Sequence, residues 1–180
     1  MYKKLFYIIP FVTFVILAVY FYARLELKTP QLKSMLIGLA VPKFELAPIQ
    51  GRDKKGFKHS DLIGNVSLVN IFGSWCAACL QEHPFLIKLK NTNFIPIHGI
   101  DWRETERFSG PEWLKRHGDP YTLVGDDPKS HAAIGFGVTG APETFLIDQN
   151  GIIQHKQIGP LNEKVWNQDF LPIIKKLRQK

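Results

Sequence analysis

The sequence predicts a mixed β-sheet flanked by helices, in an α/β or α+β domain, and three observations support this fold class. Val66–Phe72 (VSLVNIF) is a continuous apolar run rich in β-branched residues, which is typical of a strand buried on both faces. A segment compatible with a helix follows this strand. Near the C-terminus, two strand-like runs flank the turn Gln149–Gly151, the pattern of a hairpin. Strands that alternate with helices in this way place helices on both faces of a mixed sheet.

The segments before the buried strand are short and extended. Val41–Leu46 avoids the helical region at its start, because Val41 precedes a proline. Gln50–Gly56 predicts a loop between short strands, and Asp61–Asn65 predicts a second turn. Helices and strands then follow one another to the C-terminus. In order, we expect a helix at 76–90, a strand at 94–100, a helix at 109–117, hairpin strands at 144–148 and 152–158, and a helix at 162–178.

The N-terminus predicts a transmembrane anchor helix. Leu5–Ala23 contains 19 residues without a charge. At about 1.5 Å per residue such a helix covers roughly 28 Å, close to the thickness of a bilayer core. A cleaved signal peptide is the alternative, but Tyr20–Tyr22 stands where small residues are needed for cleavage. Lys3 and Lys4 precede the span and favour a cytoplasmic N-terminus.

Three parts of the chain are therefore expected. Residues 1–23 form the anchor, residues 24–35 a linker, and residues 36–180 one exported domain. The net charge of +7 is dispersed rather than gathered in a stripe, so we assign no nucleic-acid partner. With only two cysteines the domain has neither a disulfide framework nor a zinc site made of four thiolates.

The two cysteines form the motif Cys76-Ala-Ala-Cys79 where the buried strand gives way to a helix. Positions i and i+3 of a helix are neighbours, so the two sulfur atoms can form a disulfide. Free backbone N–H groups and the helix dipole favour a thiolate at Cys76, at the helix start. Cys79 is expected to be more buried and less nucleophilic. This asymmetry fits a thiol exchange in which Cys76 attacks a partner and Cys79 resolves the mixed disulfide.

Other interpretations of the motif remain open at this point. A structural disulfide is one, although a loop of this size stabilises little. A metal site with Cys76, Cys79 and His83 is another, although no fourth ligand is evident. Attachment of a c-type haem would need a histidine at position 80, where the chain has Leu80.

Two longer segments carry a resemblance to a known family. Read together, Val66–Cys79 (VSLVNIFGSWCAAC) and Gly137–Gly151 (GVTGAPETFLIDQNG) resemble the thioredoxin-like proteins, and within them the DsbE/CcmG family of cytochrome c maturation. The resemblance extends from about Leu36 to Lys176, and GAPETFLID is its most specific part. It implies a thioredoxin-like fold for the exported domain.

The resemblance also implies functional residues. Pro142 would follow a cis peptide bond beside the cysteines, and the backbone of Thr139, Gly140 and Ala141 would pair with a substrate strand. Acidic residues near the redox pair map to Glu82 and Glu143, which would act in catalysis. Trp75 would shield the cysteines and contact partners. No metal is implied, and the redox-active Cys76–Cys79 pair itself serves in place of a cofactor.

The function implied is that of a membrane-anchored periplasmic thiol:disulfide oxidoreductase. It would reduce disulfides of apocytochrome c or of a maturation protein, and a transmembrane electron donor of the DsbD/CcdA type would recharge it. The expected location is the bacterial inner membrane, with a single span and the catalytic domain in the periplasm. A general periplasmic reductase or oxidant is an alternative, as is a module that binds metal or apocytochrome without turnover. The family commonly has a proline after the first cysteine and an aromatic residue in place of Thr139, so its reduction potential and partner choice do not transfer directly.

Overall fold

The computed structural model describes residues 2–25, 36–53, 55–104 and 109–179. The chain divides into two units, Met1–Lys33 and Ser34–Lys180. The first unit holds helix α1 (Tyr2–Leu25), whose large apolar side chains between Tyr7 and Tyr22 are exposed. Among the described residues, none of the helices reaches the length and apolar character that a membrane crossing requires. The predicted linker at 24–35 lies outside the described residues, except for the last two residues of α1.

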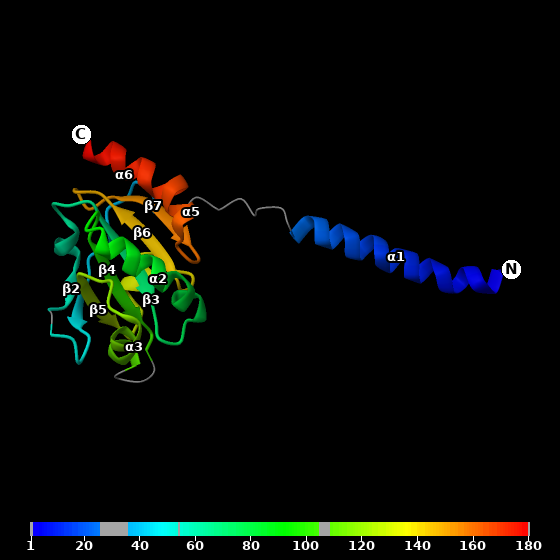
Figure 1. Ribbon diagram of the computed structural model, residues 1–180, viewed down its shortest axis with the longest axis horizontal. Helices are drawn as coiled ribbons and strands as arrows, with labels where there is room; N and C mark the ends of the chain where they lie inside the picture. Colours follow the sequence, from blue (N-terminus) through cyan, green and yellow to red (C-terminus); the bar gives the residue numbers. More distant parts are fainter. Residues whose placement is uncertain (1, 26–35, 54, 105–108, 180) are drawn as a thin grey trace. The chain divides into compact units, whose positions relative to one another are not determined.

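The second unit is a seven-stranded sheet with helices on both faces (Figure 1). The strand order is β2-β1-β5-β4-β3-β6-β7. β3 is parallel to β4, and β4 is parallel to β5, whereas the remaining neighbours are antiparallel. In chain order the elements are β1 (Glu45–Pro48), β2 (Phe57–Lys58), the 3₁₀ turn η1 (His59–Leu62), β3 (Ser67–Phe72), α2 (Ala77–Asn91), β4 (Ile97–Trp102), α3 (Ser109–His117), β5 (Leu123–Asp127), α4 (His131–Gly135), β6 (Glu143–Ile147), β7 (Ile153–Ile158), α5 (Glu163–Val165), the π-helical turn η2 (Trp166–Phe170) and α6 (Leu171–Arg178).

The predicted mixed sheet is confirmed, and so are the buried strand, the helix after the cysteines, the hairpin and the C-terminal helix. The sequence pattern missed β5 and α4. β5 has the sequence LVGDD, whose glycine and aspartates have low strand propensity. Its place in the sheet comes from parallel pairing with β4, from His98–Leu123 to Trp102–Asp127. Asp127 then accepts the backbone N–H groups of His131 and Ala133 and so begins α4.

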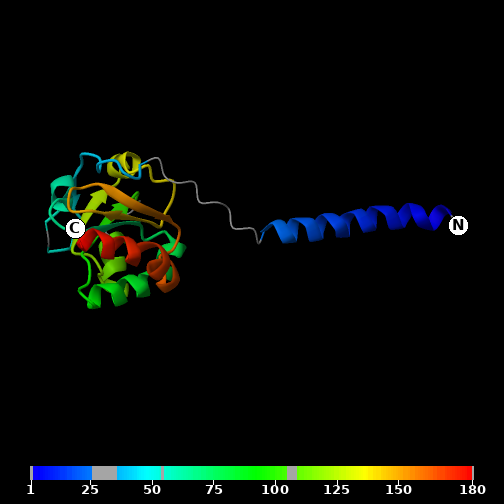
Figure 2. The same cartoon turned by 90° about the horizontal axis from the view of Figure 1, so that it is seen from above.

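The sheet separates two apolar clusters, and Figure 2 shows helices on both of its sides. On one face α2, α3 and α6 cover Leu68, Phe72 and Leu146, and this cluster includes both cysteines. On the other face α4 and η1 cover Ile71 and Phe145. All six residues of β3 are buried, because this central strand is covered on both faces. Successive side chains of a strand point to opposite faces, so neighbours along β6 belong to different clusters.

Candidate active site

Four segments that are far apart in the sequence meet at one edge of the sheet. β3 and β4 are parallel, so both of their carboxyl ends lie at this edge, where α2 begins. β6 is antiparallel to β3 and therefore starts at the same edge, directly after the loop that carries Pro142. β7 ends beside that start, since Ile158 pairs with Glu143. The edge thus brings the cysteines, the end of β4 and the Pro142 loop together.

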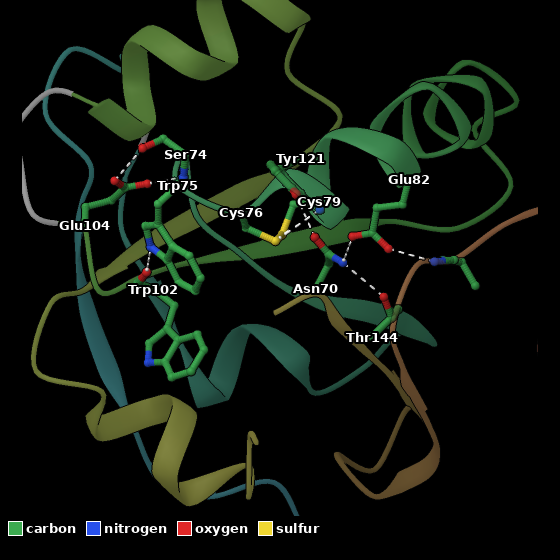
Figure 3. Close-up of a disulfide and its surroundings, with 11 residues drawn as sticks. Asn70, Ser74, Trp75, Cys76, Cys79, Glu82, Trp102, Glu104, Tyr121 and Thr144 are labelled. Atoms are coloured by element: carbon green, nitrogen blue, oxygen red, sulfur yellow. Dashed lines mark hydrogen bonds between the residues drawn. A yellow bond between two sulfur atoms is a disulfide. The ribbon is translucent and has the colours of Figure 1, made fainter. Parts of the chain in front are cut away.

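Cys76 and Cys79 form a disulfide at the start of α2 (Figure 3). Cys76 is the N-cap residue of the helix, and its Sγ accepts the backbone N–H of Cys79 at 3.1 Å. In the reduced protein, the same N–H and the positive end of the helix dipole favour a thiolate at this sulfur. Cys76 is 5% exposed and Cys79 1% exposed. The predicted order of burial is therefore confirmed, because Cys76 is the more exposed of the two cysteines.

Trp75 lies beside the cysteines and is 51% exposed. Its indole N–H donates to the backbone oxygen of Trp102 at 3.0 Å, so the ring lies over the end of β4 (Figure 3). Gly73 permits this position. A Cβ added at residue 73 would lie 2.5 Å from Nε1 of Trp75, which is too close, and 3.1 Å from the oxygen of Trp102, which is a tight contact. The hydrogen atom of Gly73 thus leaves room for the indole.

Substitution Gly73→Ala is expected to displace the Trp75 ring and to break its bond to Trp102. The loss in stability should be small, about 1 kcal/mol, because the ring is half exposed and its N–H can bond to water. The indole N–H resonance of Trp75 in ¹⁵N NMR spectra measures the effect, and Trp75→Phe assigns that resonance. An unshifted resonance in Gly73→Ala would show that the added methyl group is accommodated without moving the ring.

Glu104 holds the turn that precedes Cys76. It accepts the backbone N–H of Ser74, the hydroxyl of Ser74 at 2.7 Å and the hydroxyl of Ser109 at 2.6 Å. The nearby carboxyl of Asp101 is only 2% exposed. Burial, together with the negative charges of Glu104 and Asp126, raises the pKa of Asp101 to about 9. Asp101 is therefore protonated at neutral pH. The oxygens that accept from Ser74 and Ser109 belong to Glu104.

Glu82 lies one turn after Cys79 on α2 and is 1% exposed. Its Oε1 accepts from the side-chain amide of Asn70 at 2.8 Å, and its Oε2 accepts the backbone N–H of Leu161 at 2.8 Å. Burial raises the pKa of Glu82 to about 7, although both hydrogen bonds act in the opposite direction. This carboxyl can therefore take up or release a proton near neutral pH.

Asn70 connects Glu82 to two further buried groups (Figure 3). Its amide nitrogen also donates to the hydroxyl of Thr144 at 3.0 Å, and its oxygen accepts the hydroxyl of Tyr121 at 2.7 Å. Burial and the negative charge of Glu82 raise the pKa of Tyr121 well above 10, so the phenol remains a donor. Asn70 is therefore a core amide with partners for both its nitrogen and its oxygen. One of these partners is Glu82, which lies one turn after Cys79 on α2.

The loop before β6 has the expected form at Pro142. The Ala141–Pro142 bond is cis, as the resemblance implies, and Ala141 packs against the apolar cluster that contains both cysteines. Thr139 is exposed, but its N–H and its hydroxyl both donate to Oε1 of Glu143, at 3.0 and 2.6 Å. Glu143 is fully buried and forms an ion pair of 2.9 Å with Lys156. The structure thus places Glu143 beneath the loop, on the sheet face opposite Thr144 and Asn70.

Sequence reasoning missed several residues of the site. Tyr121, Lys156 and the backbone of Leu161 carry no local signal, because their partners lie 51, 19 and 79 residues away. The Nε2 of His83, the histidine of the alternative metal site, donates to the Gly118 oxygen at 2.9 Å. Within the ranges that the structure describes, no three His, Cys, Asp or Glu side chains are grouped as metal ligands.

Comparison with known proteins gives the family. The Redoxin family model matches residues 37–170. The thiol:disulfide interchange protein DsbE of Allochromatium vinosum is 38% identical over 167 residues, covering 93% of this chain and 91% of the relative. The chain belongs to the DsbE family. The DsbE protein of Pseudomonas aeruginosa is 35% identical and covers 97% of this chain and 96% of its own length.

Membership of the DsbE family decides among the interpretations of the Cys76–Cys79 motif. The chain is a thiol:disulfide oxidoreductase with a thioredoxin-like fold, so the redox interpretation is confirmed over the structural and metal-binding ones. A solved structure supports the fold independently. The thioredoxin domain of a thiol-disulfide oxidoreductase from Bacteroides vulgatus has a TM-score of 0.63 at 18% identity, covering 80% of this chain and 99% of that one.

Proposed function

We propose that this DsbE-family protein acts as a reductant in c-type cytochrome biogenesis, where it reduces the disulfide of apocytochrome c or of a maturation protein. The observation that carries the proposal is the pairing of an N-capping Cys76 with a resolving Cys79 that borders the buried acid Glu82. Family membership supports disulfide interchange, and the resemblance of the GAPETFLID segment to the cytochrome c maturation proteins supports the substrate class.

The proposed reaction transfers two electrons to the substrate, whose two thiolates take up their protons from water, while Glu82 takes the proton of Cys79. The Cys76 thiolate attacks one sulfur of the substrate disulfide, forms a mixed disulfide and releases the other substrate sulfur as a thiolate. Cys79 then loses its proton and attacks Sγ of Cys76, which releases the second substrate thiolate. The substrate becomes a dithiol, and the protein ends with the Cys76–Cys79 disulfide that the structure contains.

Glu82 is the proposed acceptor of the Cys79 proton. With a pKa of about 7, Glu82 is ionised in a large fraction of molecules at neutral pH. Its carboxylate can therefore accept the Cys79 proton and become a neutral carboxyl group. The Asn70 amide and the Leu161 N–H fix the orientation of both carboxyl oxygens. The proposed catalytic role of Glu143 is indirect, because its oxygens are bonded to Thr139 and Lys156.

The Thr139–Pro142 loop is the proposed binding site for the substrate strand, with Trp75 on the other side of the cysteines. Thr139 already donates its N–H and its hydroxyl to Glu143. We therefore expect the backbone of Gly140 and Ala141, and the carbonyl of Thr139, to supply the pairing groups. Pro142 has no N–H to donate, and its oxygen accepts the N–H of Gly159 at 2.9 Å.

The location and the electron supply also belong to the proposal. Residues 1–23 would anchor the domain to the bacterial inner membrane, with the catalytic domain in the periplasm. The uncharged Leu5–Ala23 segment and the preceding lysines support this topology. An oxidising periplasm does not re-reduce Cys76–Cys79, so a transmembrane donor of the DsbD/CcdA type would be required.

The substitution Cys79→Ala tests the function. Without the resolving thiol, Cys76 is expected to remain in mixed disulfides, and c-type cytochromes and their maturation proteins should dominate the trapped species in cells. Mass spectrometry of the trapped complexes identifies them, and Cys76→Ala serves as the control that traps nothing. Capture of many unrelated envelope proteins would overturn the specific role in cytochrome biogenesis. A reduction potential of about −120 mV, as in strong oxidants, would overturn the role as a reductant.

A further inference from the structure

Lys156 is a buried cation that the redox chemistry does not use. It lies on β7 opposite Phe145 of β6, and its side chain is 5% exposed. Three groups surround the ammonium. Nζ lies 2.9 Å from Oε2 of Glu143, donates to the Gly137 oxygen at 2.7 Å and lies 5.3 Å from the centre of the Phe145 ring. The Gly137 oxygen accepts a hydrogen bond from the ammonium, Glu143 supplies the opposite charge, and the face of the Phe145 ring adds a cation–π contact.

The partners of Lys156 connect it to the loop before Pro142. Gly137 starts this loop, and Lys156 binds its carbonyl directly. Glu143, the partner in the ion pair, accepts the N–H and the hydroxyl of Thr139. A single buried ion pair therefore holds the loop at two points, two residues apart. A buried charge is costly unless it is paired and hydrogen-bonded, and here both charges satisfy that condition through the loop.

The ion pair and the redox chemistry lie on opposite faces of the sheet. Phe145 belongs to the cluster beneath α4, and Glu143 and Lys156 share its face by strand alternation and by register. Cys79 belongs to the cluster on the other face, where Asn70, Glu82 and Thr144 form their network. A change at Lys156 thus reaches the loop without touching the groups that surround the sulfur atoms.

We propose that Lys156 is a positioning residue for substrate binding, which acts with Glu143 to fix the Gly137–Thr139 segment and so the backbone that pairs with the substrate. This inference rests on the proposed role of the Thr139–Pro142 loop. Loss of the ammonium releases the Gly137 carbonyl and leaves the Glu143 carboxylate buried without its counter-ion. The loop then samples several conformations, and only one of them binds a substrate strand.

The test compares Lys156→Met with the wild-type protein and with Lys176→Met, which removes an exposed lysine from α6. The substrate is a disulfide-bonded peptide that contains a CXXCH sequence. We expect KM for this peptide to rise about tenfold in Lys156→Met. We expect kcat to stay within twofold of the wild-type value and the reduction potential of Cys76–Cys79 to stay the same within experimental error. The amide resonance of Thr139 should shift in the same variant, because its acceptor moves.

The double variant Lys156→Met, Glu143→Gln keeps the test decisive if the single variant does not fold, since it removes both buried charges while retaining similar shapes. A wild-type KM in a folded Lys156→Met or double variant would overturn the inference, as would a change confined to the reduction potential. Assays with insulin separate this inference from the proposed function. A wild-type protein that reduces insulin but not the peptide would refute the cytochrome role alone, and the KM comparison is then made with insulin.

Discussion

Replacement of Asn70 by leucine is expected to lower the free energy of unfolding by at least about 3 kcal/mol, because three buried polar groups each lose a partner at a cost of about 1 kcal/mol or more. The groups are the Glu82 carboxyl, the Thr144 hydroxyl and the Tyr121 hydroxyl. Leucine has the same branching as asparagine but is larger, so no cavity forms, and the lost hydrogen bonds together with overpacking of the buried site account for the effect. Urea unfolding of the exported domain at pH 7 measures it.

Asn91→Leu is the matched control for the Asn70 substitution. Asn91 ends α2 and is exposed, so its replacement should change stability by about 0.5 kcal/mol or less. A difference between the two variants of less than about 1 kcal/mol would show that the Asn70 network does not exist in solution. Retention of the full stability with loss of activity would instead place Asn70 in the chemistry alone.

The second expected result concerns Glu82→Gln, which should slow the resolution of the mixed disulfide by at least about tenfold at pH 7, within the range of general base catalysis. The wild-type rate of this step should rise with pH through an inflection near 7, as the Glu82 carboxyl loses its proton. Glutamine cannot accept the proton, so the inflection disappears. Stopped-flow release of the second substrate thiol between pH 5 and 9 measures the rate.

Glu163→Gln is the control for this kinetic effect, because Glu163 is an exposed acid whose ion pair with Lys88 is on the surface. Its pH profile should match that of the wild type. A Glu82→Gln profile that retains the inflection near pH 7 would exclude Glu82 as the acceptor of the Cys79 proton.

The same pKa shift predicts how stability depends on pH. Glu82 has a pKa of about 7 when folded and about 4.5 when unfolded, so the folded state holds the proton more tightly. The contribution of Glu82 to the free energy of unfolding is therefore fully present below pH 4.5 and is lost as the pH rises through 7. Asp101 extends the loss to about pH 9. The wild type should lose stability as the pH rises from about 4.5 to about 9, and Glu82→Gln should remove the part of this loss that lies between 4.5 and 7.

The parts of the fold that were predictable from sequence are those with a local pattern. Such patterns are the apolar run of β3, Pro111 in the first turn of α3, Asn162 before α5 and the turn Gln149–Gly151, and each acts within a few residues. β5 lacks such a pattern because its backbone pairing with β4, rather than its composition, makes it a strand. Hydrogen bonds over 51 and 79 residues, such as those of Tyr121 and Leu161, become visible only when the chain is folded.

The candidate site divides in the same way. The spacing of Cys76 and Cys79 alone predicted their pairing, whereas the place of Pro142 beside them was implied by the resemblance to the DsbE/CcmG family. The acids Glu82 and Glu143 could be selected by resemblance, but their environments could not, because each depends on a partner from a distant segment. Asn70 determines the surroundings of Glu82, and Lys156 determines those of Glu143.

The glycine at position 73 has a consequence for how access to the sulfur of Cys76 is set. The indole of Trp75 lies over the end of β4 only because residue 73 has no side chain. The position of the indole beside Cys76 is thus set by the absence of one methyl group at a residue that lies outside α2. An alanine at this position is expected to move the tryptophan and so to reshape the surface through which a partner approaches the sulfur atom.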